Sequence, residues 1–230
     1  MPQPHMTPHP TTRTKLIATG IVVALLVAAA GTWGYLEWRH CKLMSTLVRV
    51  CYDTTLMHTG DLVFRNGLGN ESLLVTTTSN GEYSHVGIAL STPSGWQVIH
   101  AVPGESAPDE PEYVKCEPIE EFFDPHRARA GGMARVDCDS LTALAAARAA
   151  MGKVAAKVTF DNDYNLEDTT QLYCTELVRL VYMNQGIDLA DDRWAPTPGI
   201  NTTGRIVYPE HLWQSPRLAR RYEFQVKPVE

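Results

Sequence analysis

Residues 172–178 read Leu-Tyr-Cys-Thr-Glu-Leu-Val and place a cysteine where an amphipathic helix begins, directly after a polar loop. Counting from Cys174, positions 177, 178 and 181 are Leu, Val and Val, so the sulfur shares the buried face of that helix. Unpaired backbone N–H groups and the helix dipole at such a position favour a thiolate. A lone cysteine is more often a small apolar residue of the core than a nucleophile, and the histidines upstream are what favour the second interpretation.

Two short strands upstream carry histidines. Residues 84–90 (Ser-His-Val-Gly-Ile-Ala-Leu) alternate between apolar and small or polar side chains, and residues 96–101 (Trp-Gln-Val-Ile-His-Ala) form the return strand after a Pro-Ser-Gly turn. If Leu90 pairs with Gln97, then Ile88 faces Ile99 and Gly87 faces His100.

This register brings the histidines together. His85 and His100 then lie on one face as diagonal neighbours, with Cβ atoms roughly 7 Å apart. The small residues Gly87 and Ala89 on that face leave room for a helix end to approach closely, which is the physical case for a site.

Three residue types in this arrangement suit nucleophilic catalysis. A thiol nucleophile needs a base, and the base works best when a third group fixes its tautomer. Cys174, His85 and His100 could fill these roles, with the backbone N–H of Cys174 as an oxyanion donor. Each histidine alone is also typical of a half-buried structural residue, and the same three residue types would suit zinc. The spacing leaves these interpretations open.

Four segments, taken in chain order, resemble the motifs of the permuted papain-like amidases of the YaeF/YiiX type, which belong to the NlpC superfamily of cysteine hydrolases. These segments are residues 59–64 (Thr-Gly-Asp-Leu-Val-Phe), 83–88 (Tyr-Ser-His-Val-Gly-Ile), 98–101 (Val-Ile-His-Ala) and 173–178 (Tyr-Cys-Thr-Glu-Leu-Val). The resemblance covers about residues 57 to 215. It implies a circularly permuted papain-like α+β domain, an antiparallel sheet packed against helices, in which the histidine strand precedes the cysteine helix.

The resemblance also implies roles and an activity. Cys174 would be the nucleophile, His85 the base and His100 the third residue of a hydrolase that cleaves an amide bond in a peptidoglycan-type peptide, without a cofactor or a metal. The third position is commonly Glu in related enzymes. A second histidine resembles the lecithin–retinol acyltransferase branch, so a lipid acyl hydrolase or acyltransferase is an alternative. A non-catalytic membrane-tethered binding domain is the other, although intact Cys174 and His85 disfavour it.

The N-terminal part has a different composition. Residues 1–15 contain four prolines and no acidic residue, which is typical of a disordered tail. Residues 16–36 carry no charge and are long enough for one transmembrane helix, with aromatic residues near its end. A cleaved signal peptide ending at the alanines of residues 28–30 is the alternative, but the apolar run continues past them. We expect a helical stalk over 37–56 and the hydrolase domain over 57–230.

Net charge and cysteine content limit which partners and which cellular location are expected. The formal net charge is −6 and no basic stripe is present, so nucleic acid is not an expected partner. Basic residues flank the apolar span almost equally, but the resemblance favours a single-pass protein of the inner membrane with its domain on the periplasmic side. Five cysteines are too few for a disulfide scaffold. Cys41 could pair with Cys51 and Cys116 with Cys138, which would leave Cys174 free.

The remaining segments predict supporting structure. Residues 102–117 are rich in Pro, Asp and Glu and predict a surface loop, whereas Ser140 is expected to cap a helix over 141–158. The acidic stretch 160–170 resembles the start of a calcium loop. It lacks the glycine and the final glutamate that such a loop requires, so calcium is not expected there.

Overall fold

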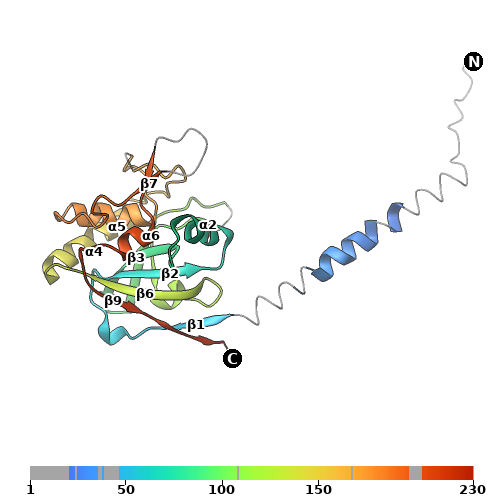
Figure 1. Ribbon diagram of the computed structural model, residues 1–230, viewed down its shortest axis with the longest axis horizontal. Helices are drawn as coiled ribbons and strands as arrows, with labels where there is room; N and C mark the ends of the chain where they lie inside the picture. The colour runs from blue at the N-terminus through green and yellow to red at the C-terminus, as the bar shows by residue number, and fades with distance from the viewer. Residues whose placement is uncertain are drawn as a thin grey trace, which may run out of the picture. The chain divides into compact units, whose positions relative to one another are not determined.

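The computed structural model describes residues 21–23, 25–35, 38, 47–107, 109–166, 168–196 and 204–229 (Figure 1). The chain divides into an N-terminal unit, Met1–Thr46, and a second unit, Leu47–Glu230. The second unit begins ten residues before residue 57, where the sequence predicts the start of the soluble domain.

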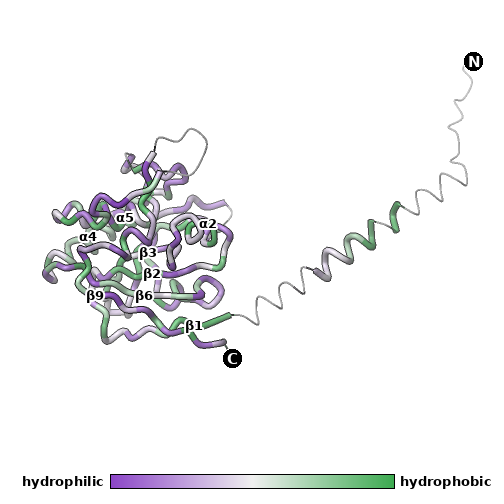
Figure 2. Tube along the Cα trace, in the orientation of Figure 1, coloured by the Kyte–Doolittle hydropathy of each residue, from purple (hydrophilic) through white to green (hydrophobic). Residues whose placement is uncertain are grey.

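The N-terminal unit is helical over residues 21–23 and 25–35, and the helix is largely apolar (Figure 2). Within the described residues, no helix has both the length and the hydropathy that a membrane crossing requires. The predicted tail (1–15) and part of the predicted anchor (16–20, 24 and 36) lie outside the described residues. The anchor therefore stays a prediction.

An antiparallel sheet of six strands, in the order β5-β4-β3-β2-β6-β9, forms the centre of the second unit. Its strands are β2 (Leu62–Gly67), β3 (His85–Thr92), β4 (Gly95–His100), β5 (Lys115–Pro118), β6 (Ala128–Val136) and β9 (Leu218–Glu223). Two small antiparallel sheets pair β1 (Val48–Cys51) with β10 (Gln225–Pro228) and β7 (Ala195–Pro196) with β8 (Arg205–Ile206). The predicted mixed α+β class with an antiparallel sheet is confirmed.

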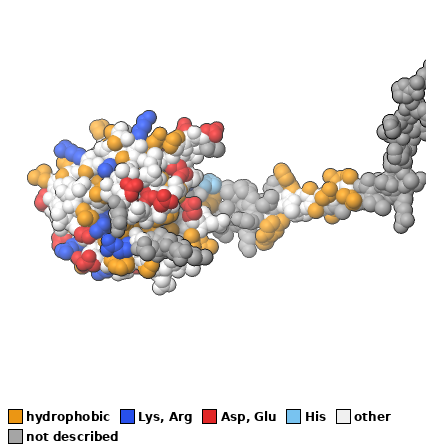
Figure 3. Space-filling model, turned by 90° about the horizontal axis from the view of Figure 1, so that it is seen from above, with side chains coloured by type: hydrophobic (Ala, Val, Ile, Leu, Met, Phe, Trp, Pro, Cys, Tyr) orange, Lys and Arg blue, Asp and Glu red, His pale blue; other side chains and the backbone are white. Residues whose placement is uncertain are grey.

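The helices cover both faces of this sheet. They are the 3₁₀ turn η1 (Thr54–Leu56), α2 (Asn70–Ser79), α3 (Ile119–Phe122), α4 (Ser140–Ala155), α5 (Cys174–Met183) and α6 (Pro209–Trp213). Helices α4 and α5 share one apolar core with Leu62, Val86 and Ile88, and the short helix α3 lies in the core of the opposite face. Exposed acidic and basic side chains are interspersed on the face that Figure 3 shows.

The hairpin register predicted from the sequence is confirmed, because Leu90 pairs with Gln97 and Ile88 with Ile99. Gly87 packs tightly against the neighbouring strand. A Cβ atom at position 87 would lie 2.5 Å from Val98 Cγ1 and 3.1 Å from the Cβ of His100. Glycine is therefore required for β4 to carry His100 this close to β3.

Several local predictions are wrong. Val48–Cys51 is a strand paired with β10, not part of a helical stalk, because residues far along the chain satisfy its backbone. Lys115–Pro118 is likewise strand β5 and not a surface loop. Asp139, rather than Ser140, caps α4, because its carboxylate accepts the N–H groups of Leu141 and Thr142.

The packing prediction for the histidine face is also wrong. Helix α5 contacts the Val86 and Ile88 side of β3, whereas Ala89 belongs to the other core together with Phe122 of α3. Gly87 faces Val98 and His100 of β4, and Ala89 shares its core with Phe122 of α3, so these small residues accommodate β4 and α3 instead of the start of α5.

Candidate active site

A pocket of about 670 Å³ lies where the start of β3 approaches the start of α5. Cys174, His85, Arg65 and Tyr164 contribute to its wall, and α2 and the loop after β4 complete it. Two of the three predicted site residues, Cys174 and His85, thus share one cavity. His100 lies behind His85 and is completely buried.

Cys174 is the first residue of α5, as the sequence predicted. The residues around it fix the start of the helix. The N–H of Tyr173 donates to the Glu176 carboxylate at 3.4 Å, and the Thr175 hydroxyl donates to the carbonyl of Val207 at 2.5 Å. The Tyr173 hydroxyl accepts the N–H of Val207 at 3.1 Å, so both residues beside Cys174 are tied to the same neighbouring segment.

The thiol is protonated at neutral pH. Burial raises the pKa of Cys174 to about 11, although the backbone N–H groups of Val86 and Thr175 act in the opposite direction. The helix start therefore does not produce a resting thiolate, contrary to the expectation from the sequence. No hydrogen bond joins the thiol to the His85 ring among the contacts of the described residues.

The two histidines are in direct contact. His85 Nε2 lies 2.8 Å from His100 Nδ1, and both rings pack against Phe122, with centroids 5.7 and 5.1 Å from its own. Burial lowers the pKa of His85 well below its usual range, and burial likewise lowers the pKa of His100 to about 4. Both rings are therefore neutral at pH 7, and the diagonal pairing predicted for them is confirmed.

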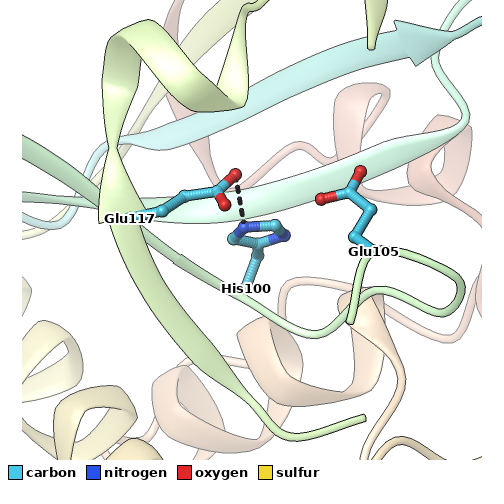
Figure 4. Close-up of side chains that lie close together, drawn as sticks. All are labelled: His100, Glu105 and Glu117. Carbon is cyan, nitrogen blue, oxygen red and sulfur yellow. Dashed lines mark ion pairs between the residues drawn. The ribbon is translucent and has the colours of Figure 1, made fainter. Parts of the chain in front are cut away.

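A carboxylate follows the second histidine. Glu117 Oε1 lies 3.0 Å from His100 Nε2 (Figure 4), although the approach is off the axis of an ideal hydrogen bond. Burial raises the pKa of Glu117, but His100 and then Lys115 outweigh that effect and bring it to about 2. We call His85, His100 and Glu117 the histidine–carboxylate chain.

Three cationic side chains surround the carboxylates next to this chain. Lys115 Nζ lies 2.9 Å from Glu117 and 2.7 Å from Glu105, and Arg127 lies 3.2 and 3.3 Å from the same two groups. Arg65, which is buried, also pairs with Glu105 and lies over the ring of Phe122 at 4.7 Å. Buried charges of both signs are thus compensated within one cluster.

This cluster contains a geometric candidate for a metal site, because ligand atoms of His100, Glu105 and Glu117 lie within 4.8 Å of one another. The donors do not fit a cation. Both carboxylates already contact Lys115 and Arg127, so a divalent ion would add to an excess of positive charge.

The zinc interpretation of Cys174, His85 and His100 fares no better. His85 Nε2 and His100 Nδ1 lie 2.8 Å apart and share a hydrogen bond. These two nitrogen atoms therefore cannot both bind the same zinc ion.

The other cysteines and the acidic stretch lie elsewhere in the sequence. Cys116 and Cys138 are free thiols, as are Cys51 and Cys174, so the predicted Cys116–Cys138 pair is absent. Cys41 lies outside the described residues. In the acidic stretch, the Asp161 carboxylate accepts the N–H groups of Asp163 and Asn165.

Sequence reasoning missed Arg65, Glu105 and Glu117. The first stands on β2 beside His85, and its pairing is set by strand register. Alternation along Lys115-Cys116-Glu117 is a weak strand signal that the surrounding acidic residues hide. Only the pairing of Lys115 with His100 shows that Glu117 is a neighbour of the histidines.

A six-stranded antiparallel sheet packed against helices defines the α+β class of this domain. The chain is similar to the crystal structure of metalloprotein YiiX from Escherichia coli O157:H7 (DUF1105), with a TM-score of 0.57 and 17% sequence identity, over 75% of this chain and 97% of that chain. No family model matches the chain, and no curated protein matches its sequence. The likeness shows the fold alone.

Proposed function

We propose that this protein is a cysteine hydrolase that cleaves an amide bond, with Cys174 as the nucleophile and His85 as the general base. The observation that carries the proposal is the shared pocket, whose wall contains both Cys174 at the start of α5 and His85, whose Nε2 contacts His100. That contact leaves Nδ1 of His85 as the ring atom free for chemistry.

The protonation states define how the reaction begins. Because the thiol and both rings are neutral at rest, the proton moves from Sγ to His85 Nδ1 as sulfur attacks the carbonyl carbon of the substrate. The N–H of Cys174 stabilises the oxyanion. His85 then gives the proton to the leaving amine, which leaves the acyl group bound to sulfur as a thioester. In the second half of the reaction, His85 takes a proton from water as the water oxygen attacks the thioester carbonyl, and it returns that proton to the sulfur as the acid product leaves.

The resemblance to the YaeF/YiiX type supports a peptide amide of the cell-wall kind as the substrate. The proposed anchor at residues 16–36 would hold the domain at a membrane, on the periplasmic side. No cofactor enters the proposed reaction. The similar solved structure, YiiX, is described as a metalloprotein. We place no metal in this chain at the Glu105 and Glu117 cluster, because its carboxylates are already paired with cations.

A lipid-directed acyl hydrolase or acyltransferase is the second candidate. Two observations favour it: the third residue is His100 and not Glu, and α2, which lines the pocket, exposes Leu73 and Leu74. Both reactions use the same thioester chemistry, so they differ in the substrate alone.

A substrate screen tests the proposal. The purified full-length chain is incubated with muropeptides or with phospholipid vesicles, and the products are identified by mass spectrometry. We expect new amine termini from muropeptides, and none with Cys174→Ala. Turnover of phospholipid alone would replace the amidase by the second candidate, and turnover that persists in Cys174→Ala would exclude both.

A further inference from the structure

Glu117 is a buried carboxylate with no part in the steps above. It stands on β5, where Lys115 pairs with His100 and Glu117 pairs with Val98 of β4. Since side chains alternate along a strand, Glu117 points to the same face as His100. Its Oε1 atom lies 3.0 Å from His100 Nε2, and neither atom has another polar partner among the described residues.

We propose that Glu117 is a positioning residue, which sets the tautomers of His100 and His85 so that the ring atom facing the pocket can accept a proton. This inference rests on the proposed hydrolase function. Glu117 itself touches neither the thiol nor the substrate, and it acts through His100.

The direction of the chain follows from what each group can donate. An ionised carboxylate accepts hydrogen bonds and cannot donate, so the proton of His100 resides on Nε2. His100 Nδ1 is then an acceptor, and the 2.8 Å contact requires a proton on His85 Nε2. His85 Nδ1 is left with a lone pair, which takes the proton from the sulfur of Cys174.

Without Glu117 the opposite arrangement becomes equally possible. His100 would carry its proton on Nδ1 and donate to His85 Nε2, and the remaining proton of His85 would occupy Nδ1 and block the base. The ion pairs at the other oxygen of Glu117 keep its carboxylate ionised and in place, since Lys115 lies 2.9 Å and Arg127 3.2 Å from Oε2. Oε1 therefore remains for His100.

A second effect acts in the same direction. Proton transfer from the thiol leaves a positive charge on the buried His85 ring, which no carboxylate of the described residues contacts directly. Glu117 is the carboxylate at the far end of the histidine contact, and its negative charge stabilises that imidazolium through His100.

The rate at which iodoacetamide alkylates Cys174 tests the proposal without a known substrate. Trypsin releases residues 158–179 as a peptide in which Cys174 is the only cysteine, so mass spectrometry follows this site alone. In the full-length chain, Glu117→Gln should lower the alkylation rate at pH 7 about 10- to 100-fold. The reason is that the Gln amide can donate a hydrogen bond to His100 Nε2, which reverses the direction of the hydrogen bonds between the two histidines. The acid limb of the rate against pH should shift as well.

The double variant separates positioning from a general structural effect. If Glu117 acts through His100, then Glu117→Gln added to His100→Gln should change the rate by less than about twofold. Asp61→Asn is the matched control, because it removes a buried carboxylate that is paired with Arg135 and does not line the pocket, and its effect should stay below about threefold. An undiminished effect of Glu117→Gln in the His100→Gln background would overturn the proposal.

Nitrogen-15 spectra of the histidine rings test the tautomers in the unmodified chain, so the proposal stays falsifiable if a variant does not fold. His85→Gln and His100→Gln spectra assign the two signals among the eight histidines. We expect both rings to be protonated on Nε2, and a proton on Nδ1 of His100 would refute the proposal. Hydrolysis that survives Cys174→Ala would instead defeat the proposed function, so the two failures are distinguishable.

Discussion

The two faces of strands β3 and β4 bury side chains of opposite kinds. On the α5 side, Val86, Ile88 and Ile99 are fully buried in an apolar core. On the α3 side, His85 and His100 are buried with a carboxylate and several cations behind them. Burial of each apolar side chain stabilises the fold by roughly 1.5–3 kcal/mol, whereas buried ionic groups contribute little net stability even when paired. Side-chain alternation along the same two strands thus places the stabilising apolar residues on one face and the candidate catalytic histidines on the other.

The largest expected contrast lies within one helix. Cys174→Ala should abolish hydrolysis, by about 10⁴-fold or more, and change the free energy of unfolding by less than about 1 kcal/mol. Leu177→Ala, one turn further along, should lower the free energy of unfolding by about 2–5 kcal/mol and preserve the turnover of the molecules that remain folded. Product assays and urea denaturation measure both variants. If both variants lost activity and stability to a similar extent, the residues for catalysis and those for stability would not be separate.

Gly87→Ala tests the contact between the two strands. The added methyl group would meet Val98, the carbonyl of Ile99 and His100, so we expect a loss of about 1–3 kcal/mol in unfolding free energy. Displacement of His100 should lower turnover by about 10²-fold as well. Crystal structures or ring spectra of the variant would show the displacement. Turnover at the normal rate would mean that the position of His100 does not matter.

Two buried carboxyl groups should respond to pH in opposite directions. Burial raises the pKa of Glu176 from 4.5 to about 8, so its contribution to stability is complete below about pH 4.5 and is lost as the pH rises through 8. The pKa of Glu117 is lowered to about 2, so its contribution is present above about pH 4.5 and is lost as the pH falls toward 2.

The range from pH 6.5 to 8 isolates Glu176. The lowered pKa values of His85 and His100 make their contributions complete above 6.5, and these decline only as the pH falls. We therefore expect the free energy of unfolding to fall between pH 6.5 and 8 in the natural chain and to stay level in Glu176→Gln. Urea denaturation at both pH values decides this, and an equal fall in the variant would reject the assignment.

The smallest expected effect concerns Gly152, which serves as a counterpart to Gly87. A Cβ atom at position 152 of α4 would meet no atom within 4 Å. Gly152→Ala should therefore stabilise the chain by about 0.5–1 kcal/mol, because alanine favours the helix, and leave hydrolysis unchanged. Thermal denaturation measures the gain. A loss of stability would mean that this helix face is covered by another surface.

Local patterns predicted the parts of the site that depend on sequence neighbours. Alternation and the turn at residues 93–95 were enough to set the β3–β4 register, and the apolar spacing after Cys174 was enough to predict the start of α5. These features arise within a few residues of one another, where side-chain period and turn chemistry act directly.

Features that depend on distant residues could not be predicted in this way. Strand β1 forms against residues at the other end of the chain, and Glu117 is brought to His100 by a third strand. The protonated state of Cys174 has the same origin, because burial by the rest of the fold outweighs the favourable helix start.

The central claim is that Cys174 carries the acyl group of the substrate during turnover. The direct measurement mixes the full-length chain with muropeptides, stops the reaction with acid and weighs the tryptic peptide 158–179. We predict that this peptide gains the mass of the acyl fragment in the natural chain and does not gain it in Cys174→Ala. Two results would contradict the account. One is an acyl group found on another residue of the natural chain, and the other is product formation by Cys174→Ala.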